Sequence, residues 1–134
     1  DQAEIEKIFQ QLLILVSELD NEEARAIQNG MTEESLVIFD ILRKPGLSEE
    51  DEEHVRTTSI ELLNKIKQAI ENLNNWTKKE QTRDKVTQSI HDFLYDESTG
   101  LPESYGPLEI DELTSEVFRH TYRVYQNLPS EVFA

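Results

Sequence analysis

The only tryptophan of the chain, Trp76, lies beside a cluster of basic residues in an otherwise acidic sequence. Four of the 13 Lys and Arg residues, Lys78, Lys79, Arg83 and Lys85, fall within eight positions, whereas the formal net charge of the 134 residues is -15. Such a cluster could contact another domain, another subunit or the phosphate backbone of a nucleic acid. Alternatively, Lys79 and Arg83 could pair with carboxylates of a neighbouring helix while Trp76 fills the corner between two helices.

A helix with 100° between successive residues separates these cations into two groups. Lys79 and Arg83 fall on the side of the apolar residues that follow, which are Val86, Ile90, Phe93 and Leu94. Lys78 and Lys85 lie on the flank of this stripe, so they are the candidates for an external contact. Lys78 and Lys79 would also oppose the helix dipole, at a cost of about 0.3–1 kcal/mol each if exposed.

The sequence shows no pattern typical of a catalytic, cofactor or metal site. No Asp or Glu is followed two residues later by Lys, as in many Mg-dependent nucleases, and no Gly-Lys pair indicates a phosphate-binding loop. His54, His91 and His120 lack metal-site spacing, so we interpret them as surface or boundary residues. The acidic run 49–53 is interpreted as complementing a helix dipole. We therefore expect no catalytic, cofactor-binding or metal-binding residues in this chain.

Length and composition predict one helical domain. A chain of 134 residues can bury roughly two-thirds of its unfolded surface. It has no cysteine, no signal-peptide pattern and no apolar run of the roughly 18 residues that a membrane span needs, which favours a cytoplasmic protein without a membrane partner. A start without Met, within an amphipathic pattern, indicates a fragment of a longer protein. The acidity argues against nucleic-acid binding by the whole surface and leaves room for one local contact.

Sparse glycines and prolines, four of each, and apolar residues at helical spacing predict an all-α fold. We expect one irregular bundle of about five helices over residues 1–134. The first predicted helix covers 2–28 and ends at Gly30. Its apolar stripe widens so far over 12–16 that a central, well-covered helix is expected.

The other helices are predicted from their start and stop signals. A second, deeply packed helix covers 33–43, with Thr32 as its N-cap, and Pro45-Gly46 stops it. The third covers 49–74 after an N-cap at Ser48. The fourth helix is capped by Thr77, with Glu80 three residues on, and ends near Tyr95. A loop over 96–107 precedes the fifth helix, which covers 109–126 and has Val124 on its inner side. The tail from Leu128 is expected to fray.

The basic cluster and four other segments resemble a known family. The run from Trp76 to Arg83, followed by Val86 and Ile90, is similar to the C-terminal helical region of the restriction subunit of type I restriction-modification enzymes. Further similar segments are 36–42, 61–67, 90–96 and 100–102. The resemblance covers about 32–126, with Trp76, Lys79, Glu80 and Arg83 as its motif, whereas residues 1–30 could continue a preceding helical domain.

The resemblance implies a role in a larger enzyme. The parent subunit would carry a nuclease domain and two ATP-driven motor domains upstream, and these domains would hold the ATP and Mg. The C-terminal region would be non-catalytic and would dock this subunit onto the methyltransferase and specificity subunits, in contact with other domains of its own subunit. Two alternatives stay open: a helical module that contacts DNA through the basic cluster, and an unrelated acidic scaffold for protein interactions.

Overall fold

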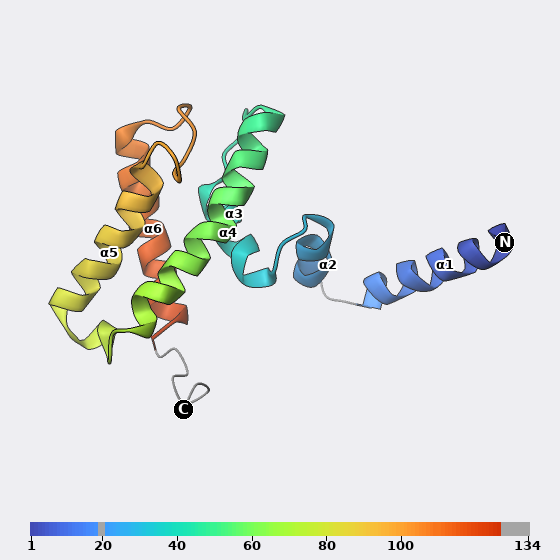
Figure 1. Ribbon diagram of the computed structural model, residues 1–134, viewed down its shortest axis with the longest axis horizontal. Coiled ribbons are helices and arrows are strands. Elements are labelled where there is room, and N and C mark those ends of the chain that lie inside the picture. Colours follow the sequence, from blue (N-terminus) through green and yellow to red (C-terminus); the bar gives the residue numbers. More distant parts are fainter. Residues whose placement is uncertain (19–20, 127–134) are drawn as a thin grey trace. The chain divides into compact units, whose positions relative to one another are not determined.

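The computed structural model describes residues 1–18 and 21–126, and the predicted frayed tail lies outside them (Figure 1). Every regular element in this part of the chain is helical, which confirms the all-α prediction. None of these helices is long and apolar enough to cross a membrane. The chain divides into two compact units, residues 1–36 and 37–134, which we describe separately.

The first unit contains two helices where the sequence predicts one. Helix α1 covers Gln2–Glu18 and α2 covers Asn21–Gln28, so the single helix over 2–28 is wrong. Helix α2 ends as predicted, because Gly30 takes a positive φ of 68° and the Met31 N–H donates to the Ala26 carbonyl oxygen at 2.8 Å.

Helix α3 (Glu33–Leu42) begins in the first unit and ends in the second. Thr32 is its N-cap, as predicted: the Ser35 N–H donates to Thr32 Oγ1 at 3.1 Å, and the Thr32 N–H donates to Ser35 Oγ at 3.0 Å. Deep packing is confirmed for most of its apolar side chains; those that are buried are Leu36, Ile38, Phe39 and Leu42.

The second unit is built on three long helices that follow one another in antiparallel order (Figure 1). They are α4 (Glu49–Glu71), α5 (Glu80–Tyr95) and α6 (Pro107–Val124), and α5 packs against both of the others. Ser48 caps α4 as predicted, since its Oγ accepts from the Asp51 N–H at 3.0 Å. The buried apolar residues of α4–α6 are Val55, Leu62, Leu63, Ile66, Ile70, Val86, Ile90, Leu94, Ile110 and Val117.

The start of α5 differs from the prediction. A 3-10 turn, η1 (Trp76–Lys78), precedes the helix, Thr77 is buried within it, and Lys79 takes the N-cap position with an extended backbone. The reason is local backbone geometry. Asn75 adopts a left-handed conformation, with φ 51°, and the 3-10 turn begins at the residue that follows it. Thr77 therefore lies inside this turn, where it cannot be the N-cap of α5. The α5 N-cap therefore has no side-chain hydrogen bond.

The ends of α6 also differ from the prediction. Pro107, predicted as part of a loop, is the first residue of the helix, where a missing N–H costs nothing. Val124, predicted on the inner side, is 52% exposed, because α6 ends there and only the following Tyr125 turns back into the core.

The loop between α5 and α6 is fastened to α4 through one glycine. The Gly100 carbonyl oxygen accepts from His54 Nε2 at 2.7 Å and from Thr58 Oγ1 at 3.2 Å. The Leu101 N–H donates to the Leu94 carbonyl oxygen at 3.0 Å, which draws the loop against the end of α5. A Cβ at position 100 would stand 2.2 Å from that same oxygen, so only glycine fits here.

Candidate functional site

Trp76 closes the corner between α4 and α5 and is 1% exposed. Its indole Nε1–H donates to the carbonyl oxygen of Tyr125 at 2.7 Å. The ring lies edge-on to Phe118 and Tyr122 of α6, with centroids 5.9 Å and 6.0 Å away. The tryptophan therefore joins the start of α5 to the C-terminal end of α6.

Arg83 secures the same corner from inside α5. Its Nη1 donates to the Thr77 carbonyl oxygen at 2.8 Å, and Thr82 Oγ1 donates to the Trp76 carbonyl oxygen at 2.6 Å. The interpretation that Arg83 pairs with a carboxylate of another helix is wrong. A 3-10 turn leaves carbonyl oxygens directed towards the next helix, and the half-buried guanidinium binds one of them.

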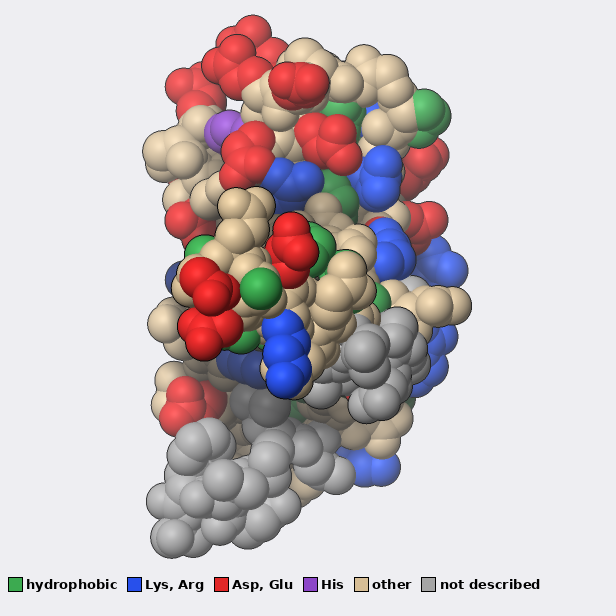
Figure 2. All heavy atoms as spheres, turned by 90° about the vertical axis from the view of Figure 1, so that its right-hand side faces the viewer, with side chains coloured by type: hydrophobic (Ala, Val, Ile, Leu, Met, Phe, Trp, Pro, Cys, Tyr) green, Lys and Arg blue, Asp and Glu red, His purple; other side chains and the backbone are tan. Residues whose placement is uncertain are grey.

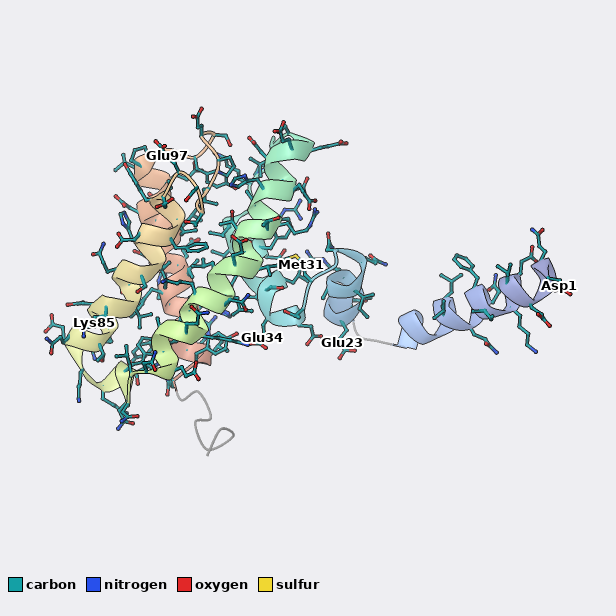
Figure 3. All side chains as sticks on the ribbon, in the orientation of Figure 1. Asp1, Glu23, Met31, Glu34, Lys85 and Glu97 are labelled. Atoms are coloured by element: carbon teal, nitrogen blue, oxygen red, sulfur yellow. The ribbon has the colours of Figure 1, made fainter. Side chains whose placement is uncertain are left out.

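The lysines of the basic cluster are exposed. Lys79 was expected on the inward face, but as the extended N-cap of α5 it lies outside the helical spacing and is exposed. Lys78 and Lys85 are also exposed, and Figure 3 shows Lys85 on the side of α5 away from α4. Glu80 is the first residue of α5 rather than part of a capping box. Their roles as family motif or external contacts remain predictions.

Two arginines that the sequence analysis did not single out extend this basic region. Arg119 and Arg123 are exposed on the C-terminal half of α6, the end that Trp76 joins to η1. They are four residues apart, so they lie on one face of the helix, and this spacing was the available signal. We call Lys78, Lys79, Lys85, Arg119 and Arg123 the basic end.

Cations at the opposite end of the bundle have acidic partners. Lys44 Nζ lies 2.9 Å from Glu109 Oε1, Arg43 Nη2 lies 3.7 Å from Glu52 Oε1, and Arg56 pairs with Glu53. In the described residues, none of the five cations of the basic end forms a salt bridge. Figure 2 shows a group of acidic side chains at the top of the face that it presents, and both acidic and basic side chains below this group.

A hydrogen-bonded cluster holds the opposite end together. The buried Tyr105 hydroxyl donates to the Leu42 carbonyl oxygen at 2.6 Å, and Lys44 Nζ lies 4.3 Å from the centre of the Tyr105 ring. Burial, followed by the carboxylates of Glu109 and Asp51, raises the pKa of Tyr105 to about 12. The phenol therefore stays protonated and acts as a structural donor.

The three histidines have separate environments. His54 bonds to the Gly100 carbonyl oxygen, and His91 Nε2 lies 3.1 Å from Asp111 Oδ1. His120 is buried, so its interpretation as a surface or boundary residue is wrong. Its ring faces that of Tyr125, with 6.2 Å between the ring centroids. Burial, and then the charge of Arg123, lowers its pKa. Among the described residues, no three His, Asp or Glu side chains are grouped as metal ligands would be.

Helix α1 carries an exposed apolar stripe. Its members are Ile5, Ile8, Phe9, Leu12 and Leu13, which are 48–66% exposed. Their spacing places all five on one face of the helix. The expectation of a well-covered helix is therefore wrong for these side chains, because apolar periodicity shows which face will be buried but not what buries it.

Comparison with protein-family models identifies a match that covers most of the chain. Over residues 1–127 the chain matches the family model described as "Type I restriction enzyme HindI endonuclease subunit-like, C-terminal". The matched region includes α1, which lies outside the resemblance over 32–126. No curated protein and no solved structure matches the chain.

Proposed function

Because the chain belongs to the family of C-terminal regions of HindI-like type I restriction endonuclease subunits, we propose that it is a non-catalytic assembly domain. It docks the endonuclease subunit onto the methyltransferase and specificity subunits of the complex. The ATP and Mg of the reaction belong to other domains of the parent subunit, which this domain also contacts.

The observation that carries this proposal is the apolar stripe of α1. Full burial of one such side chain is worth about 1.5–3 kcal/mol, so five that are about half exposed retain roughly 4–8 kcal/mol for association. Glu4 and Glu6 flank the stripe and are exposed. An apolar centre with a polar rim is the usual anatomy of a protein interface.

The test compares two pairs of substitutions in the full-length endonuclease subunit. Phe9→Ser with Leu12→Ser changes the stripe, whereas Lys7→Ser with Gln10→Ser changes the other side of α1 by the same number of serines. Each subunit is co-purified with the methyltransferase and specificity subunits, beside a subunit that lacks residues 1–134. We expect the stripe variant and the truncated subunit to lose assembly while the control retains it. Equal assembly by the truncated and intact subunits would refute the proposal.

A further inference from the structure

The five cations of the basic end have no acidic partner in the described residues, although the chain contains 28 Asp and Glu residues. At the opposite end, Arg43, Lys44 and Arg56 each pair with a glutamate. Two of the unpaired cations, Lys78 and Lys79, also stand at the start of α5, where the helix dipole disfavours positive charge. A fold that pairs its cations at one end and leaves them unpaired at the other presents an anion-binding surface.

The surface is assembled from segments far apart in the sequence and is held in place. The hydrogen bond from Trp76 to Tyr125 spans 49 positions and brings η1 to the end of α6. Arg83 and Thr82 fix the carbonyl groups of the turn from the other side. The exposed lysines of η1 and α5 and the arginines of α6 therefore extend from a rigid base, which limits the entropy lost when they bind.

We propose that the basic end binds the phosphate backbone of duplex DNA. Lysine and arginine side chains neutralise phosphates and release condensed counterions, and this needs no base contact. The family is one of restriction endonuclease subunits, which supplies DNA as the polyanion. The paired, acidic end of the bundle is repelled by the same phosphates, so the charge distribution orients the domain with its basic end towards the duplex.

The salt dependence gives the size of the effect. If each of the five cations neutralises one phosphate, log K falls against log salt with a slope of about -4.5. Between 50 and 200 mM salt the affinity then falls about 500-fold. Removing one contacting cation reduces the slope by about 0.9.

The test measures binding of the 134-residue chain to a fluorescent duplex over a series of salt concentrations. Lys79→Gln and Arg123→Gln each remove one charge from the basic end, whereas Lys7→Gln removes one charge from α1. We expect the first two to lower both affinity and slope, and Lys7→Gln to leave the slope unchanged. Circular dichroism spectra that match the parent chain establish that each variant is folded.

Two results would overturn the proposal: no DNA binding at low salt, or equal losses for Lys79→Gln and Lys7→Gln. If instead the Lys79→Gln and Arg123→Gln subunits lose assembly with the methyltransferase core while DNA binding is absent, the basic end binds an acidic protein surface. The proposal does not depend on the assembly function, because the α1 stripe variant tests assembly without changing the basic end.

Discussion

Replacing Gly100 by alanine tests how the α5–α6 loop is held. A Cβ at this position would meet the Leu94 carbonyl oxygen at 2.2 Å and the Asp96 carbonyl oxygen at 2.5 Å. Both atoms belong to the backbone, so no side-chain rotation relieves the clash. Separations below 3.0 Å are essentially never seen for a Cβ, so the loop must move away from the end of α5.

The cost follows from the hydrogen bonds that this movement disturbs. The Gly100 N–H donates to Asp96 at 2.8 Å, the Leu101 N–H donates to Leu94 at 3.0 Å, and the Gly100 carbonyl accepts from His54 and Thr58. Each of these four bonds contributes about 0.5–1.5 kcal/mol, so we expect their loss to lower the free energy of unfolding by about 2–6 kcal/mol. For a chain of this length, the melting temperature then falls by about 6–24 °C.

Thermal unfolding followed by tryptophan fluorescence measures this effect in the second unit, because Trp76 is the only tryptophan and is buried there. Gly106→Ala is the matched control: no atom lies within 4 Å of a Cβ at that position, and its φ of -85° suits alanine. Its expected change is within about 1 kcal/mol, because a poorer N-cap is offset by a less flexible unfolded chain. Equal melting temperatures for the two variants would refute the close approach at Gly100.

Three further predictions concern the stability of the second unit. Arg83→Ala lowers the free energy of unfolding by about 1–2 kcal/mol, because the hydrogen bond to the Thr77 carbonyl is lost. Lys85→Ala changes the free energy of unfolding by less than about 0.5 kcal/mol. Equal midpoints of urea unfolding for the two variants would contradict this prediction. Lys79→Ser raises the free energy of unfolding by about 1 kcal/mol in the same assay, because serine caps α5 and a cation leaves the helix start; a lower midpoint would show that Lys79 makes a stabilising contact. The folded state lowers the pKa of His120, so the unfolded chain binds the proton more readily, and the free energy of unfolding falls as the pH drops below about 6.5. In urea titrations, the free energy of unfolding should fall less between about pH 7 and pH 5.5 for His120→Gln than for the parent chain. An equal fall in both chains would exclude this histidine as the cause.

The sequence predicted features that depend on neighbouring residues. Thr32 and Ser48 cap their helices as expected, because a side-chain oxygen reaches an N–H three residues ahead whatever the rest of the fold does. The start of α5 was not predictable in this way. It depends on the left-handed Asn75 and on the bond between Trp76 and Tyr125, and neither follows from local spacing.

The candidate site was predicted in part for the same reason. Trp76 and the lysines were evident as a cluster along the chain, whereas Arg119 and Arg123 join them only because α6 returns to the same end of the bundle. Helical spacing places a residue on a face, and it says nothing about which other helix end lies beside that face. Tertiary proximity was therefore the missing information.

The bond between Trp76 and Tyr125 also has a consequence for synthesis of the chain. A nascent polypeptide leaves the ribosome from its N-terminus, and domains begin to fold as they emerge. The corner at Trp76 is therefore translated 49 residues before the carbonyl group that completes it. Helices α4 and α5 can pair early, but the tryptophan gains its last partner only after all of α6 has emerged. A chain that stops before Tyr125 would contain every residue of the original basic cluster and still lack its closing hydrogen bond.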